Sequence, residues 1–91
     1  MTEIKKKILL VDDDKFLVDM YTVKFTAADF DITPAFSGEA ALEVLKTGFI
    51  PDIIIMDMIM PGLSGVEILE EIRKHKLVPK AKIVFLTNQG Q

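Results

Sequence analysis

Three consecutive acids, Asp12, Asp13 and Asp14, directly follow the apolar run Ile-Leu-Leu-Val at residues 8–11. Two carboxylates about 4 Å apart repel each other by roughly 4 kcal/mol at the effective dielectric near a protein surface. A cluster of this kind is therefore either spread into water or arranged to hold a cation. Taken alone, an acidic triplet is more often a solvated turn with a helix cap than a binding site.

Two further polar residues stand directly after apolar runs: Asp57 follows residues 53–56, and Thr87 follows residues 83–86. In an open parallel sheet, ligands bind beyond the carboxyl ends of the strands, so these side chains are expected to converge with the acidic triplet. Oxygen ligands of this kind suit Mg²⁺, which usually joins one or two carboxylates to a phosphate. Phosphoryl chemistry is therefore the leading hypothesis, with Asp57 as the nucleophile that would form an aspartyl phosphate.

The elements that must position these residues follow from the apolar pattern. Strands are expected over residues 8–11, 30–36, 53–56 and 83–86. Helices are expected from a cap at Asp14 to about Asp29, from Ser37 to Gly48, and from Ser64 to about Lys76. This alternation predicts an α/β fold, a doubly wound parallel sheet with right-handed crossovers.

Further features of the sequence predict where two of the strands lie in the sheet and which face of the first helix packs inward. Pro34 cannot donate to a ladder, so the second strand should lie at a sheet edge, and the strongly apolar third strand should be central. In the first helix, the inward face is expected to consist of the apolar residues that recur at helical spacing, namely Phe16, Met20, Val23 and Ala27, widened by Leu17, Tyr21 and Ala28.

Composition sets the class of protein. With 91 residues, 49% of them hydrophobic, the chain is expected to form a single domain over residues 1–91. The net charge of -3 argues against binding to nucleic acid. No apolar run is long enough for a signal peptide or a membrane span, so a cytoplasmic protein without a membrane partner is expected. The absence of cysteine excludes thiolate metal sites.

Taken together, these residues resemble the receiver domain of bacterial two-component response regulators. The matching positions are Asp12-Asp13, Asp57, Met60-Pro61-Gly62 with Gly65, and Thr87. The resemblance implies a flavodoxin-like receiver fold with four strands in the order 2-1-3-4 and three helices.

The resemblance also implies a mechanism. Asp57 would accept a phosphoryl group from a histidine kinase or a phosphotransfer protein. Asp13, Asp57 and the backbone carbonyl of Ile59 would bind Mg²⁺, and Asp12 would support the metal mainly through a water. Thr87 would contact the phosphoryl group and carry the conformational switch. Such a domain catalyses only its own phosphotransfer and dephosphorylation, so it is a signalling phosphoacceptor and not an enzyme for an external substrate.

The sequence departs from this family at its end. The family continues with a fourth helix, a fifth strand that carries a lysine, and a fifth helix, and Gln91 precedes all three. We therefore expect a truncated receiver domain that is phosphorylated more slowly than an intact one. We also expect self-association, as a homodimer or larger homo-oligomer, through the strand edge at residues 82–87 or the uncovered sheet face.

Two other functions stay open at this point. A haloacid-dehalogenase-like phosphatase also has an apolar strand followed by Asp-x-Asp, as in Asp12 and Asp14, and its nucleophile would be Asp12. Alternatively, the chain is an interaction module that acts without phosphorylation, or a fragment of a longer regulator. The residue that becomes phosphorylated distinguishes the first alternative from a receiver domain, because a receiver is labelled on Asp57.

Overall fold

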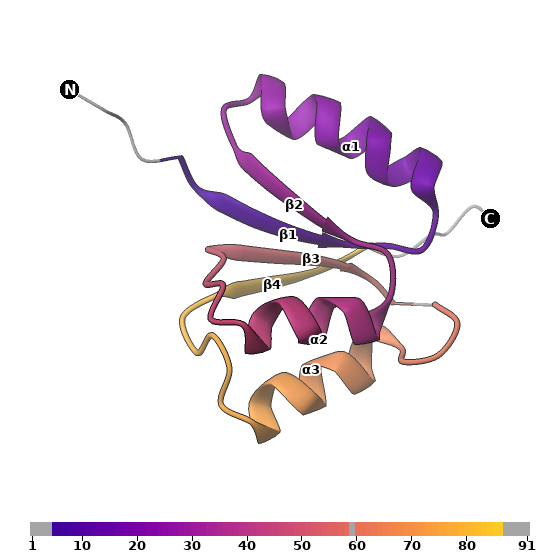
Figure 1. Cartoon of the computed structure of the whole chain (residues 1–91). Coiled ribbons are helices and arrows are strands. Elements are labelled where there is room, and N and C mark those ends of the chain that lie inside the picture. The colour runs from indigo at the N-terminus through magenta and orange to yellow at the C-terminus, as the bar shows by residue number, and fades with distance from the viewer. Residues whose placement is uncertain (1–4, 59, 87–91) are drawn as a thin grey trace.

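The computed structural model describes residues 5–58 and 60–86 (Figure 1). Its elements, in chain order, are β1 (Lys7–Val11), α1 (Lys15–Ala27), β2 (Asp31–Ala35), α2 (Gly38–Lys46), β3 (Ile53–Asp57), α3 (Gly65–Lys74) and β4 (Lys82–Leu86). All strand pairs are parallel, and the sheet order is β2-β1-β3-β4. The predicted fold class and strand order are confirmed.

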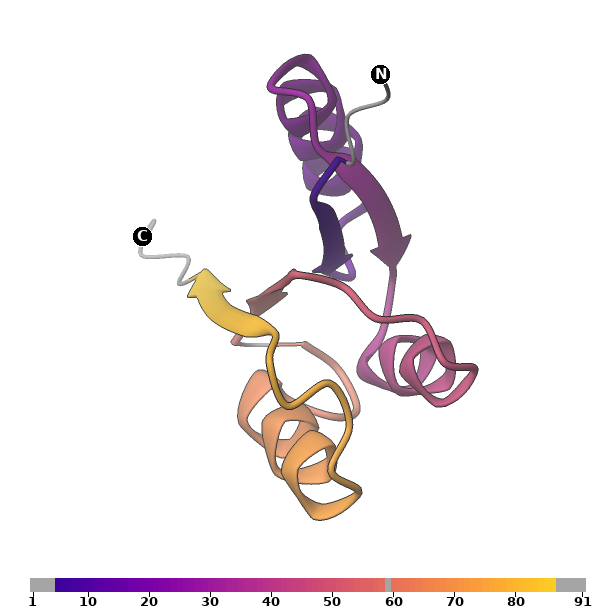
Figure 2. The same cartoon turned by 90° about the vertical axis from the view of Figure 1, so that its left-hand side faces the viewer.

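The helices lie on both faces of the sheet. Figure 2 shows α1 on one side, near β1 and β2, and shows α2 and α3 on the other side. The larger core cluster lies beneath α2 and α3 and includes Leu9, Ile54 and Met56, all with fully buried side chains. A smaller cluster beneath α1 consists of Ile8, Leu10, Val18 and Ile55. Because β1 contributes to both clusters, its uninterrupted apolar run is explained.

The strand positions follow the expected pattern. β2 is an edge strand, and its Pro34 pairs in register with Leu10 of β1. β1 and β3 form the central pair, so the most apolar third strand is indeed central. β2 begins at Asp31, one residue later than predicted, because the Phe30 N–H donates to the Phe25 carbonyl and closes the end of α1.

Side-chain caps define where the helices begin. Asp14 accepts hydrogen bonds from the backbone N–H groups of the first turn of α1, and Ser37 accepts one from Ala40. Ser64 and Glu67 form a reciprocal capping box at the start of α3, as the Ser-x-x-Glu spacing predicts. α1 and α3 end two residues before the predicted positions, at Ala27 and Lys74. Within the described residues, no helix has the length and hydropathy that a membrane span requires.

The predicted inward face of α1 is wrong for the row Phe16, Met20, Val23 and Ala27, whereas Tyr21, from the same predicted face, does pack on the core. Phe16 is 76% exposed and Val23 is 70% exposed, and Met20 and Ala27 are also exposed. The face of α1 toward the sheet is formed by buried Val18, together with Tyr21 and Phe25, which pack against the same small cluster. The helix carries apolar residues on two opposite sides, and helical spacing alone does not say which side packs on the sheet.

Candidate functional site

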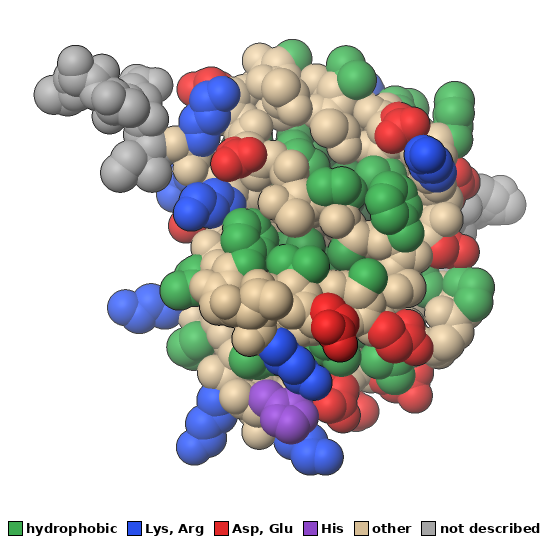
Figure 3. All heavy atoms as spheres, in the orientation of Figure 1, with side chains coloured by type: hydrophobic (Ala, Val, Ile, Leu, Met, Phe, Trp, Pro, Cys, Tyr) green, Lys and Arg blue, Asp and Glu red, His purple; other side chains and the backbone are tan. Residues whose placement is uncertain are grey.

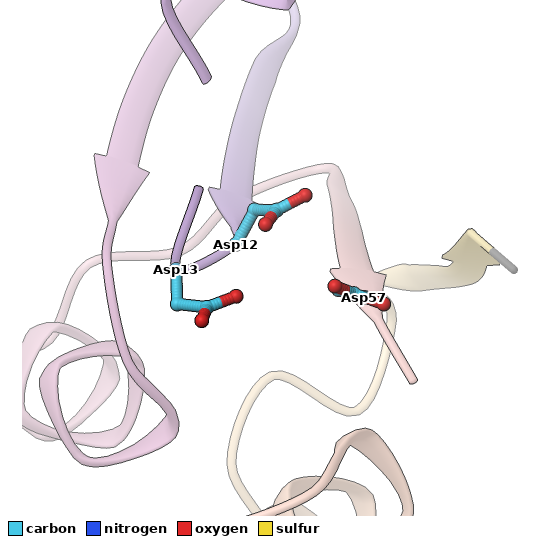
Figure 4. Close-up of side chains that lie close together, drawn as sticks. All are labelled: Asp12, Asp13 and Asp57. Carbon is cyan, nitrogen blue, oxygen red and sulfur yellow. The ribbon is translucent and has the colours of Figure 1, made fainter. Parts of the chain in front are cut away.

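The carboxyl ends of β1 and β3 bring three acids together. Val11 pairs in register with Met56, so the residues that follow them in the chain, Asp12 and Asp57, lie at the same edge of the sheet. Asp13 follows Asp12, and its carboxylate points toward the same space (Figure 4). One carboxylate oxygen from each of the three residues lies within 4.8 Å of the other two. The long-range pairing of two strands therefore creates the cluster that the sequence predicted.

Asp12 is the most buried of these acids, with 3% of its surface exposed. Its Oδ1 accepts a hydrogen bond of 2.9 Å from the Asp14 N–H, and its own N–H donates to the Ala35 carbonyl at 3.1 Å. Burial raises the pKa of Asp12 above its ordinary value of 3.8, and the Asp14 N–H opposes that rise. The nearby charges of Asp57, Asp13 and Asp14 raise this pKa further.

Asp14 has a different role from its neighbours. Its Oδ1 accepts the N–H of Phe16 at 3.0 Å and the N–H of Leu17 at 3.2 Å. These bonds satisfy two of the backbone donors that every helix leaves free at its start. The predicted helix cap at Asp14 is confirmed: this residue caps α1 and lies outside the three-carboxylate cluster.

Asp57 is the last residue of β3, and the backbone around it is held by β4 and α3. Asp57 pairs with Leu86 in the ladder, and the Met58 N–H donates to the Leu86 carbonyl at 3.3 Å. The Gly65 N–H in turn donates to the Met58 carbonyl at 3.3 Å. Asp57 is half-buried, whereas Asp13 is exposed. The carboxylate that the sequence assigns as nucleophile therefore stands on a fixed backbone next to solvent.

Gly65 is a site residue whose structural reason the sequence analysis missed. A Cβ built on Gly65 would lie 2.8 Å from Cε1 of Phe85 and 3.0 Å from the Asp57 carbonyl oxygen. Only a residue without a side chain lets the start of α3 approach Asp57 this closely. The sequence carried a signal for this contact, since glycine is an unfavourable residue inside a helix and Gly65 is the first residue after the Ser64 cap.

The donor set fits a hard divalent cation. The cluster offers carboxylate oxygens alone, which is the ligand type that Mg²⁺ prefers. The mutual repulsion of three carboxylates that share one small space would be relieved by a bound cation. Two other predicted site groups, the Ile59 carbonyl and Thr87, lie outside the described residues, so their predicted roles are not tested.

Comparisons with known proteins agree with this geometry. The family model of the response regulator receiver domain matches residues 8–91. The uncharacterized transcriptional regulatory protein YrkP of Bacillus subtilis is 37% identical over 81 residues, which cover 89% of this chain and 33% of that protein. The alkaline phosphatase synthesis transcriptional regulatory protein PhoP of Bacillus subtilis is 35% identical over 75 residues, covering 82% of this chain and 31% of that protein.

Comparison with a solved structure of a response regulator agrees with the family match. The response regulator protein TrrA of Thermotoga maritima, in complex with Mg²⁺ and BeF, superposes with a TM-score of 0.79 at 38% identity. The match covers 90% of this chain and 69% of that one. The chain spans about a third of the length of the curated relatives it matches.

Proposed function

The chain belongs to the response regulator receiver domain family, and on that basis we propose that it is a phosphoacceptor domain of a two-component system. Asp57 takes the phosphoryl group, and the donor is a histidine kinase or a phosphotransfer protein. The observation that carries the proposal is the convergence of Asp12, Asp13 and Asp57 at the carboxyl edge of a parallel sheet.

The positions of the three acids support the following transfer. A carboxylate oxygen of Asp57 forms a bond to phosphorus while the bond between phosphorus and the donor nitrogen breaks. Water later attacks the same phosphorus, releases inorganic phosphate and regenerates the carboxylate. Asp12, Asp13 and Asp57, with the Ile59 carbonyl, would hold Mg²⁺, which when bound offsets the negative charge of the phosphoryl group. The domain thus serves signalling and turns over no external substrate.

The environments of the acids favour Asp57 over Asp12 as the nucleophile. Asp12 is buried, and one of its oxygens is occupied by the Asp14 N–H. Asp57 is half-buried and ends its strand where the chain turns away from the sheet. An incoming phosphoryl group therefore reaches Asp57 more readily. This difference supports the receiver function and opposes the dehalogenase-like phosphatase, which needs Asp12 as nucleophile.

Several finer features belong to the same proposal. Thr87 contacts the phosphoryl oxygen and transmits its presence, and the domain works in the cytoplasm. The β4 edge and the sheet face beside α1 stay predicted surfaces for self-association.

The test is mass spectrometry after incubation with acetyl phosphate and Mg²⁺. The wild-type chain is expected to gain one phosphoryl group on Asp57, and Asp57→Asn to gain none, because the amide is not a nucleophile for this transfer. Asp31→Asn is the matched control, since Asp31 is an exposed aspartate at the start of β2, the opposite end of the sheet from the cluster. It should be labelled like the wild type.

Two results would contradict the proposal. Phosphate found on Asp12 would support the phosphatase instead. Unchanged labelling of Asp57→Asn would show that the reactive group lies elsewhere in the chain.

A further inference from the structure

Helix α1 exposes a row of apolar side chains to solvent. We call this row the outer stripe, and it consists of Phe16, Met20, Val23 and Ala27. Phe16 is 76% exposed, Val23 70% and Met20 37%, and Ala27 is also exposed. Single exposed apolar residues are common, but a continuous row along one helix is typical of an interaction surface.

The outer stripe points away from the sheet. Successive helical residues are turned by about 100°, so the four stripe residues lie about 140–180° around the helix from buried Val18. Figures 1 and 2 show α1 at the margin of the molecule, with the sheet on its inner side only. A segment that covered the sheet beside α1 would therefore leave the outer stripe exposed. A helix that is apolar on two opposite sides needs a second partner.

The spacing within the stripe is that of a helix pair. The intervals are four, three and four residues, which place Phe16 and Val23 at d positions and Met20 and Ala27 at a positions of a heptad. This is the pattern of a seam between two helices that supercoil, and it is narrower than the broad face a helix presents to a protein core.

The charged residues beside the seam indicate which helix the outer stripe would bind. Asp19 falls at a g position and Lys24 at the following e position, and both side chains are exposed. In a parallel pair of identical helices, a g residue lies next to the e residue five positions later on the other helix. Within the described part of the chain, neither Asp19 nor Lys24 forms an ion pair. A second copy of α1 therefore offers an opposite charge to each.

We propose that the outer stripe binds a second copy of this chain, through parallel, in-register pairing of the two α1 helices. The two-fold axis runs along the seam, so that each stripe residue meets its own equivalent. Asp19 of each copy pairs with Lys24 of the second copy, which gives two symmetric ion pairs. An antiparallel pair would instead bring g against g and e against e, and Asp19 would face Thr26 without a charge partner.

The rest of each domain leaves room for this arrangement of the two α1 helices. Because the stripe points directly away from the sheet, the two sheets would lie on opposite sides of the seam. Both acidic clusters would lie toward one end, since α1 begins immediately after Asp12 and Asp13. The outer stripe spans fewer than two heptads, so the association is expected to be weak. The fraction of dimer should therefore depend strongly on protein concentration. This surface is separate from the β4 edge and from Asp57.

The first experiment is sedimentation equilibrium of the 91-residue chain over a concentration series up to millimolar protein. The wild type is expected to dimerise reversibly. Phe16→Gln combined with Val23→Gln should raise the dimer dissociation constant at least about tenfold, because two layers of the seam are lost. Ile50→Gln is the matched control, since Ile50 is as exposed as Val23 (70%) but lies outside α1. Circular dichroism checks that each variant folds.

A wild type that stays monomeric at millimolar protein would overturn the proposal and assign the stripe to a different protein. Equal weakening by the Ile50 control would also overturn it, because the association would then be unspecific. Asp57→Asn is expected to dimerise like the wild type, so a failure of the phosphoacceptor function leaves this result intact.

The second experiment tests orientation by exchanging charges, and it avoids apolar substitutions that could disturb folding. Asp19→Lys and Lys24→Asp should each weaken the dimer, because each places like charges together in the parallel pair. The double variant Asp19→Lys with Lys24→Asp restores the opposite-charge pairs and should recover the wild-type dissociation constant. Single variants without effect, or a double variant as weak as the singles, would exclude parallel pairing.

Discussion

At the scale of one residue, Asp12 is a buried carboxylate that lies beside two other acids at the carboxyl edge of the sheet. Among the described residues, Asp12 is the only charged residue that is buried. Burial and three neighbouring acids all raise its pKa, and the Asp14 N–H compensates only in part. A side chain that makes the free protein less stable persists in such a place when it serves a site.

Asp12→Asn should stabilise the metal-free protein at neutral pH. Asparagine keeps an oxygen for the Asp14 N–H and removes the buried charge. A raised pKa means that the native state binds more protons than the unfolded state between pH 3.8 and the folded pKa. Wild-type stability therefore falls as the pH rises through this window. The advantage of the variant should be full above the window and disappear as the pH falls below 3.8.

Urea unfolding in the presence of a chelator, at neutral pH and at acidic pH, measures this difference. Asp31→Asn is again the control and should change stability little, because Asp31 is exposed. A variant that is less stable than the wild type at neutral pH would show that the Asp12 carboxylate stabilises the free fold.

At the scale of elements, the contact between α3 and β3 depends on Gly65. The N–H of this glycine donates to the Met58 carbonyl, and its missing side chain leaves room for Phe85 and the Asp57 carbonyl. The capping box of Ser64 and Glu67 fixes the first turn of the same helix. The start of α3 is thus one of the supports that hold the Asp57 backbone in place.

Gly65→Ala should destabilise the fold by about 1–3 kcal/mol, the usual cost of overpacking. It should also slow acetyl-phosphate labelling, because the added methyl displaces the Asp57 backbone. Gly38→Ala is the matched variant: its Cβ would lie 2.8 Å from Ile68 and 2.8 Å from Leu63, but it touches no residue of the acidic cluster. Both variants should lose stability by denaturant unfolding, and only Gly65→Ala should be labelled more slowly per folded molecule. Equal labelling of the two would remove Gly65 from the positioning of Asp57.

At the scale of the whole molecule, charge is unevenly distributed. Residues 73–82 contain five of the eleven Lys and Arg residues and no acid. Figure 3 shows Lys and Arg side chains around the end of α3 and the start of β4, and acidic side chains along the lower right of the view. The three-carboxylate cluster lies at the carboxyl edge of the sheet. The negative charge is therefore concentrated at this site to a degree that the net charge of -3 does not show.

Mg²⁺ should therefore stabilise the folded protein. A ligand that binds only the native state adds about 1.4 kcal/mol at a concentration ten times its dissociation constant. Thermal unfolding in Mg²⁺ should show a higher Tm than in NaCl of equal ionic strength, which controls for screening. Asp13→Asn should lose most of this increase, and Asp31→Asn should keep it. The same increase in both variants would show that Mg²⁺ does not act through the acidic cluster.

The sequence by itself determined the order of the elements, the edge position of β2, the helix caps at Asp14 and Ser64, and the acids at the carboxyl ends of β1 and β3. These features depend on local properties: the missing N–H of proline, the reach of a capping side chain, and the length of an apolar run. The family resemblance rested on the same local residues.

Only the tertiary structure decided which side of α1 packs on the sheet, how closely Gly65 approaches Asp57, and how deeply Asp12 is buried. Each of these depends on contacts between segments far apart in the chain. α1 has two apolar stripes with the same helical period, and periodicity gives spacing without saying which stripe finds a partner. The side of α1 that carries Val18 packs on the sheet, and Phe16, Met20 and Val23 lie on the exposed side.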